Sequence, residues 1–377
     1  MKKYRKTALV LKYTAAFLAS ALVFAGIQRL FMPKFMSDVF DGALIGEYYS
    51  QSSAASALNH DVIFLGDCEV YQNFSPPVLF REFGITSHVR GGPSQTMWQS
   101  YWLLRDTLLF ADVPPKVVVL SVLSMRRGDE LEGNNEFARA DDAARREAYN
   151  RLNIDGMRMS EAKLGSAESS MQEGESLLSY VFPLLRYKDR WRELSHDDTR
   201  YFWEARNVGF NGYLVRSEVR PVLANPPPPR RPDSYEFPAI TRDYLERIRR
   251  LCEENGIELI LFKSPAPSPH WWNEWDEQIA EYAQGHALKY FSLVTQAEEI
   301  GIDWQLHTPN QGQNLNVAGA EILTRWFGEQ ISYLPDLRTN AAIVADWERL
   351  NAAYERHKAK QLRELAEFDE VRTNTWQ

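Results

Sequence analysis

Short apolar runs alternate with helical patterns along most of this chain, and this alternation restricts the fold more than any other feature. Residues 62–65 and 117–120 are unbroken apolar runs that each end at small or polar residues. Such runs are typical of strands buried on both faces of a sheet. Strands that alternate with helices form a parallel sheet covered by helices on both sides. The pattern therefore predicts an α/β fold.

Further elements extend this pattern. Residues 85–89 predict a second strand, and Ser94 is the expected N-cap of the helix that follows. A helix over 242–254 ends at Asn-Gly and leads into a strand over 257–262, which favours a βαβ connection. Residues 288–291 predict one more strand. The five expected strands suffice for one central sheet.

The N-terminus predicts a membrane anchor over residues 13–32. Basic residues dominate positions 1–12, and residues 8–27 supply the roughly 20 apolar positions that a spanning helix needs if Lys12 reaches the inner interface. The basic flank places the N-terminus in the cytoplasm and the rest of the chain outside. A cleaved signal peptide remains the alternative. Either interpretation exports everything after residue 33.

Composition excludes several function classes. The formal net charge of −8 argues against a nucleic-acid surface, which needs clustered Lys and Arg. The sequence contains no HExxH, CxxC or phosphate-loop motif, so neither a metal nor a cofactor is expected. Cys68 and Cys252 are too few for a disulfide framework. We expect Cys252 to lie on the buried face of its helix.

The chain divides into a tether (33–60), a main domain (61–333) and a helical tail (334–377). Within the main domain, periodicity weakens over 126–235, and this insertion ends in a proline-rich segment. The insertion is either a lid over the site or a surface elaboration. The tail carries an apolar stripe that docks either on the body or on a partner; the stripe comprises Trp347, Leu350, Tyr354, Gln361 or Leu362, Leu365 and Phe368.

Distinctive loops follow the predicted strands. Gly66-Asp67-Cys68-Glu69 follows the first strand, Arg90-Gly91-Gly92-Pro93 the second, and Ser121 the third. A fourth distinctive segment, residues 303–320, precedes the last helix of the domain. Because ligands of open α/β sheets bind beyond the carboxyl ends of the strands, these loops are where a site is expected.

Together these segments resemble the four sequence blocks of the SGNH/GDSL hydrolases. The resemblance covers about residues 60–332 and is closest to a bacterial membrane-anchored subgroup near the proteins of envelope-polymer O-acylation. It implies a three-layer, flavodoxin-like fold with a central parallel sheet. Here the fold would carry an N-terminal transmembrane helix and a C-terminal helical tail.

The resemblance also assigns roles to residues. Cys68 stands where the family has its serine nucleophile, and Gly91 or Gly92 supplies an oxyanion-hole N–H. Ser121 stands where the family usually has an oxyanion-hole asparagine. Asn310 and Asn314 stand where the family has its catalytic aspartate and histidine, so the catalytic set is degenerate.

An amide cannot replace the histidine as a general base. His307 and His270 are the candidate substitute bases. Cys68 is either a reactive thiol, which needs less help from a base than a serine does, or a packed small side chain. The charges of Asp67 and Glu69 count against activation because both raise the pKa of a neighbouring thiol.

Three further residues are expected to contact substrate: Asp67, Trp271 and Trp304. Tryptophan faces stack on sugar rings, although Trp-rich loops also simply close a core. If the protein is active, the resemblance implies an esterase or O-acyltransferase that acts on an acylated envelope glycan or a lipid-linked acyl donor. The alternative is a non-catalytic polymer-binding or assembly partner of a membrane-bound O-acyltransferase. A structural role through the terminal helix is a third possibility.

Overall fold

The computed structural model describes residues 2–33, 35–36, 39–40, 43–50, 58–128, 140–203, 209–225, 231–267 and 271–375. The chain forms two compact units. Unit 1 consists of Met1–Asp41 with Met171–Arg206, and unit 2 consists of Gly42–Ser170 with Asn207–Gln377. The expected insertion at 126–235 is thus shared between the two units.

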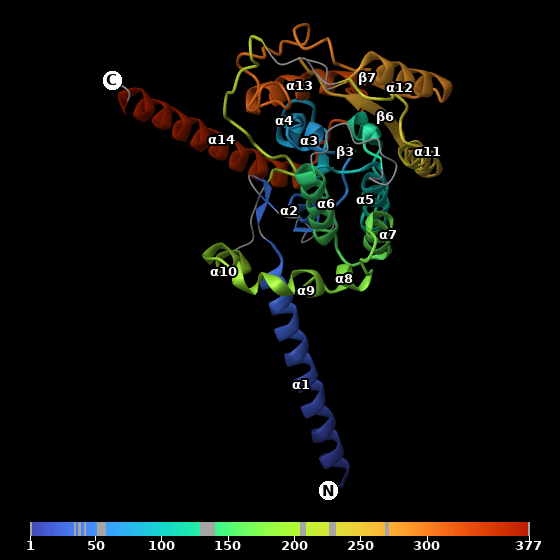
Figure 1. Ribbon diagram of the computed structural model, residues 1–377, viewed down its shortest axis with the longest axis vertical. Helices are drawn as coiled ribbons and strands as arrows, with labels where there is room; N and C mark the ends of the chain where they lie inside the picture. The colour runs from blue at the N-terminus through green and yellow to red at the C-terminus, as the bar shows by residue number, and fades with distance from the viewer. Residues whose placement is uncertain are drawn as a thin grey trace. The chain divides into compact units, whose positions relative to one another are not determined.

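A five-stranded parallel sheet forms the centre of unit 2 (Figure 1). Its strands are β3 (Val62–Gly66), β4 (Ser87–Gly91), β5 (Val117–Ser121), β6 (Glu258–Lys263) and β7 (Lys289–Ser292). The order across the sheet is β4-β3-β5-β6-β7, which is the flavodoxin-like order. The predicted α/β class with a central parallel sheet is confirmed.

The second strand of the sheet in chain order, β4, differs most from its prediction. It covers Ser87–Gly91 instead of residues 85–89, because Gly91 still pairs with Gly66. The next helix, α5 (Met97–Phe110), is capped by Thr96 rather than by the predicted Ser94. Thr96 and Gln99 form a reciprocal capping box, which satisfies two helix N-terminal donors.

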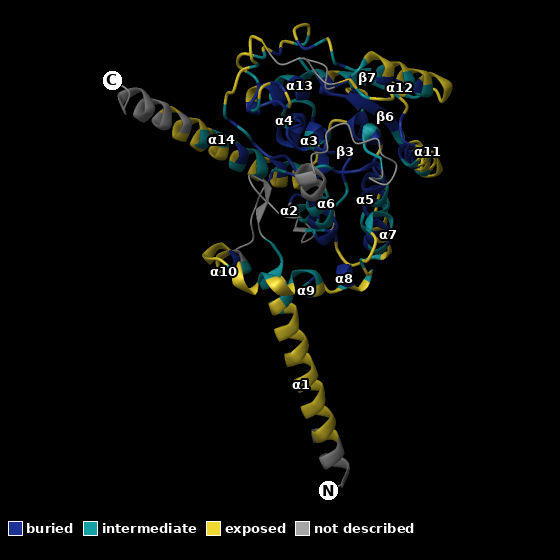
Figure 2. Ribbon diagram, viewed as in Figure 1, coloured by how far each residue is buried: buried dark blue, intermediate teal, exposed yellow. Residues whose placement is uncertain are grey.

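Helices cover both faces of the sheet, whose central strands are buried (Figure 2). Successive side chains of a strand point to opposite faces, so both faces carry core residues. On one face lie α5, α11 (Ala239–Glu254) and α12 (Asn273–Gly285), which pack on Ile63 and Leu65. Cys252 is buried in this layer, as predicted. On the other face lie α3 (Cys68–Tyr71), α4 (Pro76–Phe83) and α13 (Val317–Gln330).

Aromatic packing holds the second face. Phe64 of β3 stacks on Phe74 with ring centroids 4.4 Å apart and meets Phe327 of α13 at 5.6 Å. Phe262 of β6 contacts the same two rings. Buried aromatic pairs of this kind contribute about 0.5–1.5 kcal/mol each beyond area burial. This cluster fixes α13, and with it the segment that precedes α13, against the sheet.

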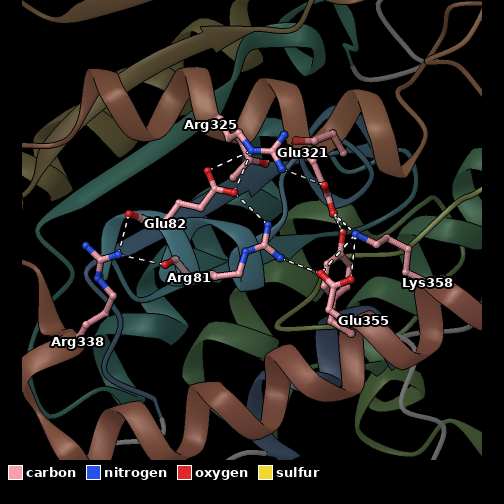
Figure 3. Close-up of polar contacts among 10 residues, drawn as sticks. Arg81, Glu82, Glu321, Arg325, Arg338, Glu355 and Lys358 are labelled. Atoms are coloured by element: carbon pink, nitrogen blue, oxygen red, sulfur yellow. Dashed lines mark hydrogen bonds and ion pairs between the residues drawn. The ribbon is translucent and has the colours of Figure 1, made fainter.

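The tail forms α14 (Ala341–Thr375), whose first half packs against the rest of unit 2. Trp347 stacks on Phe80 at 4.8 Å, and buried Tyr354 donates a hydrogen bond to Glu321. Around this contact, ion pairs link α4, α13 and α14 (Figure 3); they involve Arg81, Glu82, Glu321, Arg325, Glu355 and Lys358. Leu362 is exposed, while the side chains of Leu365 and Phe368 lie outside the described residues.

Unit 1 is built around α1 (Lys2–Phe31). Within it, Leu9–Phe31 is apolar and long enough to cross a membrane, which overlaps the predicted 13–32 anchor. The unit also contains a two-stranded hairpin, β1 (Phe35–Met36) and β2 (Val39–Phe40). Its remaining elements are α8 (Leu178–Val181), α9 (Leu184–Tyr187), η3 (Lys188–Arg192) and α10 (His196–Trp203).

Candidate functional site

The loops singled out in the sequence gather at the carboxyl edge of the sheet. In the ladder, Gly66 pairs with Gly91, and β5 lies between β3 and β6. Consequently the loops after β3, β4, β5 and β6 are neighbours. Of the predicted site residues, Cys68, Gly91, Gly92 and Ser121 therefore lie at one edge.

Gly66 makes the turn from β3 into α3 possible. Its φ is +146°, and a Cβ built on it would lie 2.7 Å from Cβ of Ser121. Only glycine tolerates both constraints. The turn carries Asp67 into the N-cap of α3 and places Cys68 first in the helix, half-buried.

Asp67 is fully buried and has a structural role. One carboxylate oxygen accepts the N–H of Glu69, and the other forms an ion pair with Arg127 at 2.5 Å. Arg127 also donates to the carbonyl of Gln95. Burial disfavours the Arg127 charge, but the surrounding anionic groups, Asp67 first among them, together raise the Arg127 pKa. Asp67 therefore joins the loops after β3, β4 and β5, in contrast to the predicted contact with substrate.

Glu69 forms a buried ion pair with Lys263, the last residue of β6. The carboxylate lies 2.5 Å from the Lys263 ammonium and accepts a second hydrogen bond from Ser121 at 3.0 Å. Both charged side chains are almost completely excluded from solvent. Lys263 also donates to the carbonyl of Ser264. The Ser121 hydroxyl, expected in the oxyanion hole, thus donates its hydrogen bond to Glu69 instead.

The environment of Cys68 opposes ionisation. Burial raises the pKa of the Cys68 thiol above its ordinary range, and the charges of Asp67 and Glu69 act in the same direction. Arg127 and Arg126 oppose this shift without overcoming it. Only the thiolate is a strong nucleophile, so this environment works against activation of Cys68.

Gly91, the last residue of β4, and Gly92 differ in what they offer an oxyanion. A Cβ on Gly91 would lie 2.6 Å from Val70 and 2.9 Å from the Gly66 carbonyl oxygen, so this position requires glycine. The Gly92 N–H already donates to the carbonyl of Gly66 at 3.3 Å. Gly92 therefore contributes no free donor in this conformation.

Asn153 is a site residue that sequence patterns did not reveal. It belongs to α6 (Ala140–Asp155), in the first part of the insertion, and is buried. Its side chain would lie 2.4 Å from a Cβ on Gly92, and its amide donates to the carbonyl of Pro93 at 3.0 Å. This part of the insertion packs against the glycine loop.

The asparagine segment before α13 is linked to the same edge through Asn73. The Asn73 side chain accepts the N–H of Leu315 and donates to Ser264. Asn310 accepts the N–H of Asn314, while the buried Asn314 side-chain oxygen has no hydrogen-bond partner among the described residues. A buried acceptor without a partner favours binding of a donor from outside the chain.

Of the two candidate bases, the structure describes His307 and not His270. The ring Nδ1 of His307 accepts the N–H of Asp303 at 2.9 Å, which fixes the turn of its own segment. His270 lies outside the described residues. Within the described ranges, no hydrogen bond or ion pair joins a histidine to Cys68. The general base of an acyl-transfer reaction is therefore not visible there.

The tryptophans near this edge are mainly packed. Trp271 is 3% exposed and donates its indole N–H to Asp276, and the Lys263 ammonium lies 5.7 Å from its ring centroid. Trp304 is half-buried. Trp271 thus has the core-closing role that the sequence left as the alternative to sugar stacking. Among the described residues, no cluster of three or more His, Cys, Asp or Glu side chains could hold a metal.

No protein-family model matches the chain, and no curated protein matches it. Among solved structures, one from Bacteroides fragilis is named a "putative acylhydrolase" and shares 12% identity, with a TM-score of 0.32, over 72% of this chain and 86% of its own. A GDSL-like lipase from Bacteroides thetaiotaomicron shares 13% identity, with a TM-score of 0.33, over 77% of this chain and 98% of its own.

Proposed function

We propose that this chain is an SGNH/GDSL-hydrolase-like protein of the bacterial cell envelope, held by α1 with its N-terminus in the cytoplasm and unit 2 outside. In this proposal the Cys68 edge binds an acylated envelope glycan or a lipid-linked acyl donor without efficient turnover. The four sequence blocks and the flavodoxin-like strand order support the fold relationship. A membrane-bound O-acyltransferase is the partner that this placement suits.

One observation carries the low turnover: the polar groups around Cys68 are engaged within the protein. Asp67 is paired with Arg127, and Glu69 is paired with Lys263 and Ser121. Burial raises the pKa of the thiol at the nucleophile position, which works against its activation. Loss of a triad base alone typically lowers the rate by several powers of ten.

Binding remains well supported by the same edge. The buried Asn314 oxygen is an unused acceptor for a sugar hydroxyl, and the Arg126 and Arg127 guanidiniums lie close enough to Cys68 to lower its pKa. Hydroxyl recognition by a buried acceptor gives strong discrimination, because a ligand that lacks the hydroxyl leaves the acceptor unpaired. An anionic, hydroxyl-rich polymer fits this combination of groups.

Acyl transfer by Cys68 is the second candidate, and one observation favours it: the thiol is half-buried rather than fully buried at the position of the family nucleophile. A substrate that lowers the thiol pKa on binding would allow slow formation of a thioester. The thiol proton and the alkoxide released from the ester would then leave together as an alcohol.

Hydrolysis of an activated acetyl ester by the full chain in detergent separates the two candidates. We expect the parent protein and Cys68→Ala to hydrolyse it at the same background rate, because burial raises the thiol pKa and no histidine of the described residues is bonded to Cys68. The Cys252→Ala variant controls for the other thiol. A parent rate that exceeds the Cys68→Ala rate by tenfold or more would favour acyl transfer over binding.

The polymer-binding experiment uses the same preparation. Retention on acetylated cell-wall polysaccharide is expected to fall about 5- to 150-fold in Asn314→Leu, because each lost buried hydrogen bond to a ligand is equivalent to about 1–3 kcal/mol. Equal retention by Asn314→Leu and the parent protein would show that this edge does not bind the polymer.

A further inference from the structure

Unit 1 has a row of exposed apolar side chains that packing does not explain. We use "collar" for Leu178–Trp203, which comprises α8, α9, η3 and α10. Leu178 is 59% exposed, Phe182 40% and Leu185 54%, and the three lie within eight residues, in α8, in the break after it and in α9. Trp191 in η3 is 59% exposed. Large apolar side chains grouped in this way mark a surface that meets another apolar phase.

The collar is joined to the C-terminal end of α1 (Figures 1 and 2). Phe182 meets Phe24 of α1 edge-to-face, with ring centroids 5.9 Å apart. Arg190 donates a hydrogen bond to the carbonyl of Phe31, the last residue of the helix. On α10, Phe202 lies 5.8 Å from the guanidinium of Arg29. The collar thus contacts the last two turns of the membrane-crossing segment.

These contacts set the depth of the collar along α1. Phe24 lies seven residues before Phe31, so Phe182 lies about 10 Å below the end of the apolar segment, at 1.5 Å per residue. Helices that lie in the plane of a membrane interface bury their apolar side about 5–10 Å into the boundary between headgroups and acyl chains. The depth of Phe182 matches that layer.

The collar carries five basic and four acidic side chains, and the basic ones are concentrated in one run. Residues 186–192 read Arg-Tyr-Lys-Asp-Arg-Trp-Arg, with four basic side chains and one acidic one. Arg192 lies over the Trp191 ring at 4.6 Å, and Arg190 is held by Asp198 at 3.1 Å. Tryptophan and arginine side by side are enriched where a protein surface crosses from acyl chains to headgroups.

We propose that the collar lies in the extracytoplasmic interface of the membrane that α1 crosses, with Leu178, Phe182, Leu185 and Trp191 among the acyl chains and the basic run among the headgroups. This rests on the membrane anchoring in the proposed function and is independent of the Cys68 site. A lipid surface is the occupant because the collar contacts the end of α1, the helix that the proposed function places in the membrane. The protein would then hold the membrane by one crossing helix and one in-plane surface.

The test places a polarity-sensitive fluorophore at single cysteines of the full chain, in a Cys68→Ser, Cys252→Ala background. The collar positions are Leu178→Cys, Leu185→Cys and Trp191→Cys. Leu18→Cys in α1 is the control for the anchor, and Leu306→Cys in unit 2, which is 56% exposed, is the aqueous control. The protein is reconstituted alone in vesicles of phosphatidylcholine with a minority of phosphatidylglycerol.

We expect nitroxide-bearing lipids to quench most of the fluorescence at the three collar positions and at Leu18, while iodide in the aqueous phase quenches only the Leu306 label. Collar labels that iodide quenches as strongly as the Leu306 label would overturn the collar proposal, and would point to a protein partner instead. If the Leu18 label is also open to iodide, the membrane anchor of the proposed function fails together with the collar.

Discussion

Replacing Lys263 with Met is expected to lower the free energy of unfolding by about 3–5 kcal/mol, because removal of one partner of a buried ion pair leaves an uncompensated charge. The charge left behind is Glu69, which is excluded from solvent and would keep only its hydrogen bond from Ser121. The measurement is the guanidinium unfolding midpoint of the full chain in detergent.

Two variants sharpen this test. The double variant Glu69→Gln with Lys263→Met removes both charges and is expected to recover most of the loss, since a neutral pair has no charge to strand. Arg81→Met breaks ion pairs with Glu82 and Glu355 that are about a third or more exposed (Figure 3), and is expected to cost less than about 1 kcal/mol. A double variant as unstable as Lys263→Met would show that the pair does not act as a unit.

Acidification is expected to destabilise unit 2 through His60 and His88. The two rings lie 5.3 Å apart, both are buried, and neither makes a hydrogen bond among the described residues. Burial lowers the pKa of His60 to about 4, against an opposing effect of Asp61, and lowers that of His88 well below its ordinary value. His60 and Arg90 lower the His88 pKa further.

The sign follows from proton uptake on unfolding. Below the ordinary value of 6.5 the unfolded chain binds protons at both histidines while the folded chain does not, so the free energy of unfolding falls as pH falls. Each histidine contributes about 1.4 kcal/mol per pH unit, and for His60 this continues down to about pH 4.

Glu47 acts in the opposite direction. Burial raises its pKa to about 8, although backbone N–H groups of Gly212, Asn211 and Gly209 oppose the shift. Between its ordinary pKa of 4.5 and about pH 8, the folded chain therefore binds a proton at Glu47 that the unfolded chain lacks. The pH dependence of the unfolding free energy from Glu47 thus cancels that from one histidine. Between pH 6.5 and 5 we expect a net slope of about 1.4 kcal/mol per pH unit, roughly doubled in Glu47→Gln and near zero in His60→Phe. Equal slopes in all three proteins would refute this assignment.

Local patterns were sufficient to predict the sheet and the position of Cys68. The strands over 62–65 and 117–120 are continuous apolar runs, and glycine at the end of β3 marks the turn that presents the next residues. These signals are short-range, and the parallel connection then brings the strand ends together by topology alone. The boundaries moved by only one or two residues.

Long-range pairings left no such pattern. Glu69 and Lys263 are 194 residues apart, and Arg127 reaches Asp67 from a loop with no periodicity. The one available signal was a charge at the carboxyl end of two apolar runs, acidic after residues 62–65 and basic after residues 259–262. Asn153 was hidden in the insertion, where weak periodicity gave no helix boundaries. The collar was missed because helices of four residues are too short to show a 3.6-residue repeat.

The ionisation state of Cys68 is the most direct test of the central claim, that this edge keeps the position of a nucleophile but not its activation. The rate of alkylation of Cys68 by iodoacetamide, followed against pH in a Cys252→Ala background, reports the thiolate fraction. We predict a rate that still rises beyond about pH 9, since burial and the flanking carboxylates raise the thiol pKa. A rate that reaches its plateau at or below about pH 7 would show an activated thiolate and contradict this account.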